Sequence, residues 1–492
     1  MTTTAVRYET VIGLEVHAQL LTQSKMFCAC PIPSLDSRPN SHVCPVCLGM
    51  PGVLPVINRR AVELTIMTGL ALKCRILEEA KFDRKNYHYP DLMKGYQISQ
   101  YDLPLCRDGG LEIDVDGVSK RIGITRVHLE EDTAKSAHVS GQAGETYSLV
   151  DVNRAGLPLM EIVSEPDVRS AEEARAYLIK LRQILRYIGA SRANMEEGNM
   201  RCEPNVSIRP AGETTLGQKV ELKNINSFKH AHDAINYEVQ RQTKVLESGD
   251  RVIQETRGWR EDIGQSVSQR SKEYADDYRY FPEPDLPTLS LDRAWIDEIR
   301  GRMPELPEAK RTRFREEYGL TDYDAAVLVE TRARADFFEE TVTLTQGEAG
   351  RRAKAVANWV NGDLARLLNA AKVEIEHSPI TPAMLAALLD LQDEDTISGA
   401  TAKGVLEEMF QTGRSADEIV QAKGLGQITS GDEVSNAVLA AIQANPKAVA
   451  DYRGGKEEAV KFLLGQVMRE TKGRAKPDVV LQILREKLSD NP

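Results

Sequence analysis

The pattern of apolar and polar residues divides the chain into a first part with strands and a second part without them. In residues 8–20 every second side chain is apolar, and Glu15 and His17 fall on the opposite, polar side of the predicted strand. Residues 111–125 alternate in the same way and predict a hairpin. Residues 170–188 instead have a helical period after a capping box, which predicts a helix.

Strand patterns end at a proline-rich stretch that closes at Pro287, and only helical patterns follow it. We therefore predict an α+β domain in residues 1–292, an all-α helical domain in residues 293–400 and an all-α tail domain in residues 401–492. A chain of 492 residues is long enough for several domains and at least one sizeable core.

Composition and charge narrow the class of protein. The hydrophobic and charged fractions, 41% and 28%, are those of a soluble globular protein. The sequence has no signal-peptide pattern and no apolar run of membrane-spanning length, so we expect a cytoplasmic protein with no membrane partner. Because the net charge is −11, any nucleic-acid partner must be held by local basic patches.

Four of the seven cysteines form two close pairs, Cys28 with Cys30 and Cys44 with Cys47. Two thiolate pairs separated by a short loop suit one tetrahedral zinc ion, and four thiolates leave no open coordination position. We therefore predict a structural zinc site. The alternative is four unrelated reduced thiols, whereas the odd total without a signal peptide argues against a disulfide framework.

Two carboxylates interrupt apolar strand patterns in the centre of the chain. Glu131 shares one side of its pattern with Val127 and Leu129, and Glu161 lies within the apolar run 157–163. A lone buried carboxylate is costly unless it is paired or bound to a metal ion. A shared cation at an active site would satisfy both, and so would structural ion pairs with arginines such as Arg126 or Arg154.

Basic residues interleave with tyrosines in residues 84–96, where Arg84, Lys85 and Lys94 could receive phosphate or RNA. The alternative is an ordinary solvated loop. The sequence contains no phosphate loop, dinucleotide turn, zinc-binding His-Glu-x-x-His helix or nucleophile elbow. The residues alone therefore indicate either metal-assisted phosphoryl chemistry or a binding module.

Several segments resemble the B subunit of the aspartyl/glutamyl-tRNA amidotransferases. They are residues 8–17 (YETVIGLEVH), 82–91 (FDRKNYHYPD), 96–100 (YQISQ), 124–132 (ITRVHLEED), 153–167 (NRAGLPLMEIVSEPD), 195–198 (MEEG) and 277–285 (DYRYFPEPD). These motifs are long and specific, and the similarity extends over nearly the whole chain.

The resemblance implies an α+β cradle followed by a helical domain and a helical tail that contacts tRNA. It also implies an activity. The side-chain carboxylate of misacylated Glu-tRNA(Gln) or Asp-tRNA(Asn) would be phosphorylated by ATP and then amidated with ammonia. A glutaminase (amidase), the A subunit of such enzymes, would supply the ammonia, in a heterotrimer that also contains a small C subunit. The alternative function is a non-catalytic tRNA-binding scaffold.

The resemblance further implies roles for single residues. The Mg²⁺ ligands would be Glu15, His17, Glu131 and Glu161, and the structural zinc ligands Cys28, Cys30, Cys44 and Cys47. Lys85, Lys94, Arg126 and Arg154 would join the Mg²⁺ ligands in catalysis. ATP would be contacted by Arg84, Lys85, Arg126 and Arg154, and tRNA by Lys472, Arg474 and Lys476.

Overall fold

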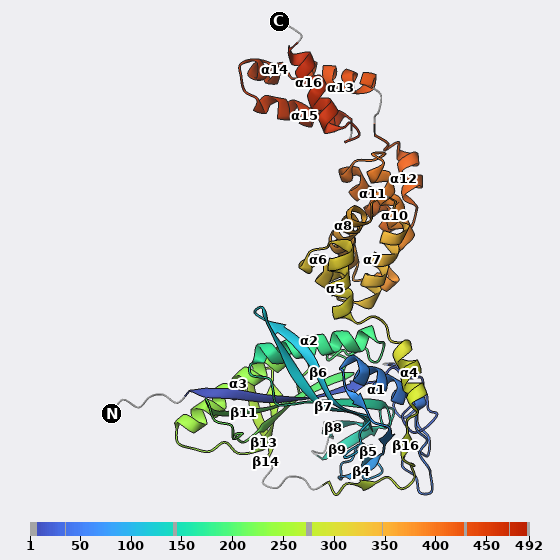
Figure 1. Ribbon diagram of the computed structural model, residues 1–492, viewed down its shortest axis with the longest axis vertical. Helices are drawn as coiled ribbons and strands as arrows, with labels where there is room; N and C mark the ends of the chain where they lie inside the picture. The colour runs from blue at the N-terminus through green and yellow to red at the C-terminus, as the bar shows by residue number, and fades with distance from the viewer. Residues whose placement is uncertain are drawn as a thin grey trace, which may run out of the picture. The chain divides into compact units, whose positions relative to one another are not determined.

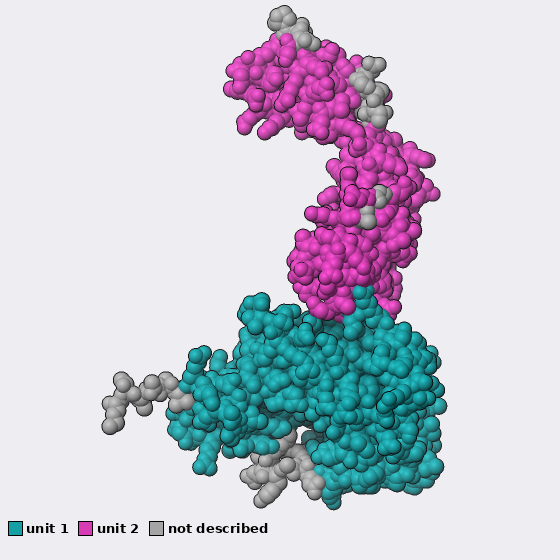
Figure 2. Space-filling model, viewed as in Figure 1, with its two compact units in different colours: residues 1–306 teal, residues 307–492 magenta. Residues whose placement is uncertain are grey.

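The computed structural model describes residues 7–34, 36–140, 145–271, 278–346, 348–427, 431–471 and 473–489. The chain forms two compact units, residues 1–306 and residues 307–492 (Figure 1, Figure 2). Strands occur in the first unit and, among the described residues, helices alone in the second, which confirms the predicted α+β domain followed by all-α regions. Within the described part of the chain, no helix has the length and apolar character needed to cross a membrane.

A 12-stranded sheet forms the centre of the first unit. Its middle strand is β1 (Tyr8–Gln19), which pairs antiparallel with β10 (Pro158–Ser164) on one side and β11 (Met200–Pro210) on the other. Beyond β10 the order continues with β7 (Val118–Glu131), β5 (Tyr96–Ser99), β4 (Asp83–Asn86) and β15 (Phe281–Pro282). Beyond β11 it continues with β12 (Val220–Lys223), β13 (Glu255–Arg260) and β14 (Gln265–Ser271).

Shorter strands complete the first unit. β6 (Cys106–Val115) and β7 form the predicted hairpin, and β2 (Arg75–Ile76) pairs with β6. Two separate two-stranded sheets are formed by β3 (Glu79–Ala80) with β16 (Leu289–Ser290) and by β8 (Lys135–Ser140) with β9 (Thr146–Asp151).

Helices cover the apolar face of the sheet and leave the polar face of β1 for other contacts. The helices of this unit are α1 (Arg59–Ala71), α2 (Ala171–Tyr187), α3 (Phe228–Glu247) and α4 (Arg293–Gly301). Ile12, Leu14 and Val16 of β1 are fully buried in the same core as residues of α1, α2 and α3. The predicted alternation of β1 is therefore explained by burial of one face only.

The first unit ends later than the boundary predicted at residue 292. Ile296 and Ile299 of α4 are buried in the core of the sheet domain, where α4 packs on α1, and the unit ends at Leu306. The prediction placed this boundary too early because a helical period identifies a helix but not the core that it joins.

The second unit contains two hydrophobic cores. The first includes buried residues from Phe314 to Val420, and the second from Val434 to Leu488. The predicted boundary at residue 400 lies within the first core, because Leu406 and Met409 are buried there. The helices of the first core are α5 (Pro307–Tyr318), α6 (Asp322–Leu328), α7 (Arg332–Leu344), α8 (Ala349–Trp359), the π-helical turn η1 (Val360–Leu364), α9 (Ala365–Ala371), the 3₁₀ turn η2 (Ile375–His377), α10 (Pro382–Asp393), α11 (Gly399–Thr412) and α12 (Ala416–Lys423). Those of the second are α13 (Gly431–Ala444), α14 (Pro446–Arg453), α15 (Glu458–Glu470) and α16 (Pro477–Ser489).

Candidate active site and metal centres

Strand pairing gathers a cluster of ionisable side chains on the polar face of the sheet. His17 of β1 is paired with Glu161 of β10, and Glu161 with His128 of β7. Because side chains alternate along a strand, Glu130 lies on the same face as His128. Nε2 of His17 is 3.4 Å from a carboxylate oxygen of both Glu130 and Glu161. Nε2 of His128 is also 3.4 Å from Glu161.

This cluster has the chemistry of a divalent-cation site. One ligand atom from each of His17, Glu130 and Glu161 lies within 4.8 Å of the others, and both carboxylates are buried. Two buried carboxylates in contact repel each other unless a positive charge lies between them. Carboxylate oxygens are the ligands that Mg²⁺ prefers, with water or phosphate in the remaining positions. These residues therefore fit a Mg²⁺ ion.

Burial and mutual contact set the protonation of the cluster. Burial acts to lower the pKa of His17, but Glu161 and Glu130 outweigh burial and raise it to about 10. Burial raises the pKa of Glu130 to about 7. Burial also acts to raise the pKa of Glu161. The imidazoles of His128 and His17 outweigh burial and hold the pKa of Glu161 below its ordinary range. Burial lowers the pKa of His128 to about 4, which leaves its ring neutral at pH 7.

Glu15 lies on the same face of β1 but has different close neighbours. It forms a second acidic group with Glu203 and Glu221, in which one oxygen from each lies within 4.8 Å of the others. Nδ2 of Asn205 donates a hydrogen bond of 2.9 Å to Glu15. Nζ of Lys223 lies 3.1 Å from Glu203 and 3.4 Å from Glu221, so this group already has a counter-charge. Burial raises the pKa of Glu15, and the charge of Glu161 adds to the effect.

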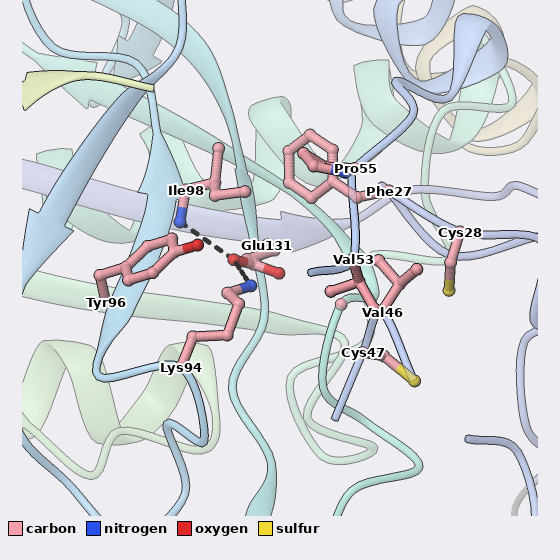
Figure 3. Close-up of a pocket in the computed structure, with 11 residues that line it drawn as sticks. Phe27, Cys28, Val46, Cys47, Val53, Pro55, Lys94, Tyr96, Ile98 and Glu131 are labelled. Carbon is pink, nitrogen blue, oxygen red and sulfur yellow. Dashed lines mark hydrogen bonds and ion pairs between the residues drawn. The ribbon is translucent and has the colours of Figure 1, made fainter. Parts of the chain in front are cut away.

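Glu131 lies on the opposite face of β7, so the prediction that it joins His17 and Glu161 is wrong in its geometry. Its carboxylate forms an ion pair with Lys94 and accepts a hydrogen bond of 3.0 Å from the backbone N–H of Ile98 (Figure 3). Glu130, and not Glu131, lies beside His17. The apolar side that Glu131 shares with its neighbours is the covered side of the sheet, whereas His17 projects from the other side.

Glu131 and Lys94 line a small cavity of about 30 Å³. Its other walls are mostly apolar and include Phe27, Val53 and Ile98, and the cavity extends to Cys28 and Cys47 (Figure 3). A cavity of this size has room for one or two molecules as small as water.

The four cysteines of the two pairs meet as predicted from their spacing. One sulfur from each of Cys28, Cys30, Cys44 and Cys47 lies within 4.8 Å of the others. Sγ of Cys44 and Sγ of Cys47 are 3.9 Å apart, and bonds of about 2.3 Å to a tetrahedral zinc ion require a separation of roughly 3.8 Å. The backbone N–H of Cys44 also donates a 3.1 Å hydrogen bond to Sγ of Cys47, which favours the thiolate. The arrangement fits zinc.

Comparison with known proteins covers both units. Residues 10–297 match the family model described as the GatB/GatE catalytic domain, and residues 336–488 match the GatB domain. The B subunit of the aspartyl/glutamyl-tRNA(Asn/Gln) amidotransferase from Carboxydothermus hydrogenoformans is 56% identical over 482 residues, covering 98% of this chain and 99% of that protein. Proteins of the same name from Dehalococcoides mccartyi and Moorella thermoacetica are 53% and 54% identical, with 98% of this chain and 99% and 100% of those proteins covered. The chain belongs to the family of amidotransferase B subunits.

Lys85 and Arg126 of this amidotransferase chain approach the cation cluster. Nη2 of Arg126 is 3.8 Å from Glu161. Nζ of Lys85 lies 4.9 Å from the ring centroid of Tyr278. Burial acts to lower the pKa of Lys85, but the charges of Glu130, Tyr280 and Glu161 outweigh it and raise the pKa well above its ordinary value. Both cations therefore face the negative charge of the cluster.

Arg84 and Arg154 make contacts that hold neighbouring segments of the amidotransferase chain in place. Arg84 donates two hydrogen bonds of 2.7 Å to Glu283 and lies over the ring of Tyr96 at 4.2 Å. Arg154 donates hydrogen bonds of 2.9 and 2.8 Å to the carbonyl oxygens of Thr133 and Ala134. The predicted contacts of both arginines with ATP stay predictions.

Two of the predicted tRNA-binding residues, Arg474 and Lys476, lie between α15 and α16. Lys472 lies outside the described residues. Nη1 of Arg474 donates to the carbonyl oxygen of Gly424 at 3.3 Å, and Nζ of Lys476 lies 2.6 Å from Asp395. Their contact with tRNA stays a prediction.

Two members of the cluster, Glu130 and His128, were missed by sequence reasoning. The available signal was the strand alternation itself, which places both of them opposite Val127, Leu129 and Glu131. Two buried nitrogen atoms on β7 also indicate that the polar face of the sheet binds a ligand. Nδ1 of His128 and Nε of Arg126 are buried without a hydrogen-bond partner among the described residues.

Proposed function

We propose that this amidotransferase chain uses ATP and Mg²⁺ to phosphorylate the side-chain carboxylate of Glu-tRNA(Gln) or Asp-tRNA(Asn), and then amidates it with ammonia. The observation that carries the proposal is the buried cluster of His17, Glu130 and Glu161 with Lys85 and Arg126 facing it. Such a cluster is costly for folding alone and suits a reaction that moves a phosphoryl group.

The chemistry requires an activated carboxylate. Ammonia does not displace oxide from a carboxylate, whereas phosphate is a good leaving group. His17, Glu130 and Glu161 would hold the Mg²⁺ ion, which when bound neutralises charge on the phosphate oxygens of ATP. Lys85 and Arg126 would stabilise the negative charge of the transferring phosphoryl group. Glu15, two residues before His17, would extend the acidic face toward the nucleotide.

Ammonia would come from a partner. We propose that its source is the glutaminase (amidase) A subunit, in a complex with a small C subunit. The cavity beside Lys94 and Glu131 is large enough for ammonia and too small for the aminoacyl group, and its walls are mostly apolar. It would form part of the path by which ammonia reaches the phosphorylated carboxylate.

The four-cysteine cluster would hold a structural zinc ion. The segment between the cysteine pairs is rich in proline and contains no helix or named strand among its described residues, so few backbone hydrogen bonds hold it. Four thiolates would fix this segment and leave the zinc ion without an open position for chemistry.

The tRNA body would contact the second unit through Lys472, Arg474 and Lys476. Contacts of this kind read the phosphate backbone and shape rather than bases. The expected cytoplasmic location suits a tRNA substrate and stays a prediction.

A reconstituted complex tests the proposed function against a non-catalytic scaffold. The chain and its partner subunits receive Mg²⁺, ATP, glutamine and either Glu-tRNA(Gln) or Asp-tRNA(Asn). We expect ATP cleavage that depends on the charged tRNA, together with formation of the amide; uncharged tRNA is the control. A complex that binds both charged tRNAs but cleaves no ATP with either would instead be a scaffold.

The aromatic ring of Tyr278 is expected to position Lys85. Tyr278→Leu removes the ring 4.9 Å from Nζ of Lys85, so kcat for ATP cleavage should fall about tenfold while the KM for tRNA changes little. Tyr278→Phe keeps the ring and should retain most of the activity. An equal loss in both variants would assign the effect to the hydroxyl group and would contradict the positioning role.

A further inference from the structure

The turn that carries the second cysteine pair lies directly against Lys94. The backbone N–H of Leu48 closes this turn by donating a hydrogen bond of 3.0 Å to the carbonyl oxygen of Cys44. A Cβ atom built on Gly49 would lie 2.5 Å from Cγ of Lys94 and 3.3 Å from its Cα and backbone N atoms. Carbon atoms in favourable contact are roughly 3.5–4.0 Å apart, so any side chain at position 49 would displace Lys94.

Backbone conformation and packing hold Gly49 at this position. Its φ angle of +65° lies in the left-handed region, which glycine adopts without steric cost. Leu48 precedes Gly49 and Met93 precedes Lys94, and both pack on the small hydrophobic cluster that contains Ala134. The close approach of the two segments is therefore a packed contact and not a chance proximity of two loops.

The other contacts of Lys94 direct its side chain toward Glu131. Its ammonium group forms the ion pair with Glu131 and lies 5.5 Å from the ring centroid of Tyr96. The side chains of Lys94 and Glu131 are only 16% and 6% exposed. Moving one partner of such a pair leaves the other charge buried without a counter-charge. Lys94, Glu131 and Cys47 line the same cavity, so a displaced Lys94 would change its wall (Figure 3).

The cysteine cluster determines where this turn lies. Cys44 and Cys47 both belong to the turn, and Gly49 follows Cys47 by two residues. The sulfurs of the two cysteine pairs lie within 4.8 Å of one another, and the loop between the pairs has no helix or named strand among its described residues. Four thiolate bonds to one ion would fix the turn relative to the first pair, whereas the metal-free turn would depend on a few hydrogen bonds.

We propose that Gly49 positions Lys94, so that metal binding by the four cysteines holds the ion pair between Lys94 and Glu131. The inference deepens the proposed function, because it rests on the zinc site and the ammonia path named there. Gly49 touches no substrate and acts only through Lys94. The metal centre would thus keep one charged wall of the cavity in place, in addition to fixing its own loop.

Chemical labelling of Lys94 in the assembled complex tests the inference. Acetic anhydride acylates accessible amines, and mass spectrometry of the peptides measures the reaction at each lysine. Lys73, whose side chain is 71% exposed, provides the reference. Removal of zinc with a chelator should raise the labelling of Lys94 relative to Lys73 at least about threefold, and added zinc should reverse the rise. Gly49→Ala should give a similar rise with zinc still bound.

Gly52 provides the matched control. Its φ angle is +84°, but a Cβ atom there would meet no atom within 4 Å. Gly52→Ala therefore introduces comparable backbone strain without the contact with Lys94, and its labelling should equal that of the wild type. Unchanged labelling after zinc removal and in Gly49→Ala would overturn the inference, and a rise in only one of the two would contradict the coupling. If Gly49→Ala does not assemble, zinc removal from the wild type decides.

A second readout separates positioning from a general loss of structure. Glutamine-dependent amidation by Gly49→Ala should fall about tenfold, whereas its activity with added ammonia should stay close to that of Gly52→Ala. Equal losses with both nitrogen sources would contradict the positioning role.

The labelling requires neither ATP nor tRNA, so its result is independent of the proposed reaction. A complex that never cleaves ATP but shows both rises in labelling would contradict the proposed function and leave the inference standing. A complex that cleaves ATP but shows neither rise would contradict the inference alone. The zinc content is measured first, because a complex without zinc would contradict both the proposed metal site and the role given to the metal here.

Discussion

Glu130→Gln is expected to lower tRNA-dependent ATP cleavage by at least about 100-fold. The change is nearly isosteric but removes one of the two carboxylates that lie within 4.8 Å of each other and of His17. A neutral amide cannot replace the charge that attracts Mg²⁺ to a buried position. The same variant should bind Mn²⁺, measured by electron paramagnetic resonance, at least about tenfold more weakly.

The adjacent residue provides the matched control. Glu131→Gln makes the same chemical change on the same strand, but its side chain faces Lys94 on the opposite side of the sheet. We expect its Mn²⁺ affinity to remain close to that of the wild type. Its glutamine-dependent activity should fall more than its activity with added ammonia, because Glu131 lines the proposed ammonia path. Weaker Mn²⁺ binding by Glu131→Gln than by Glu130→Gln would contradict the structural assignment.

This pair of residues also shows how far the sequence could predict the site. The alternation of β1 placed Glu15 and His17 together on the polar side, and the structure confirms that placement. The alternation of β7 equally placed Glu131 on the apolar side. Two residues on opposite faces of one sheet cannot bind the same ion, so the alternation of β7 pointed to Glu130, and not Glu131, as the neighbour of His17.

The pairing register of distant strands could not be predicted from the sequence. His17 faces Glu161 because β1 pairs with β10 across more than a hundred residues of chain, and no local pattern specifies that pairing. In contrast, the cysteine cluster was predictable because its two pairs are close in sequence and a short loop brings them together.

The same reasoning explains the domain boundaries. Periodicity predicted helices after residue 293, and the structure confirms them. It could not show that α4 belongs to the first core, because the burial of Ile296 depends on α1, which lies far earlier in the chain.

Cys44→Ser is expected to remove the zinc ion and to loosen the segment that it holds. Wild-type protein should contain roughly stoichiometric zinc, and the variant should lose nearly all of it, because three thiolates and a hydroxyl bind zinc far more weakly. Metal analysis by atomic absorption measures this loss. Limited proteolysis within residues 28–56 should become about tenfold faster, since this segment has few backbone hydrogen bonds of its own.

Cys202→Ser is the control for this change. Cys202 is also a free cysteine, but it is buried on β11 outside the cluster, so its variant should keep the zinc ion and resist proteolysis. Wild-type protein that contains no zinc when purified from zinc-rich medium would contradict the proposed metal site.

Loss of zinc should also disrupt the proposed ammonia path. Cys28 and Cys47 line the same cavity as Glu131, so a loosened cysteine loop opens one wall of that cavity to water (Figure 3). Glutamine-dependent amidation by the Cys44→Ser complex should then fall about tenfold, because ammonia escapes before it reaches the phosphorylated carboxylate. Added ammonia bypasses the path and should restore most of the product. An equal loss with both nitrogen sources would place the effect at the cation cluster instead and would separate the zinc site from ammonia delivery.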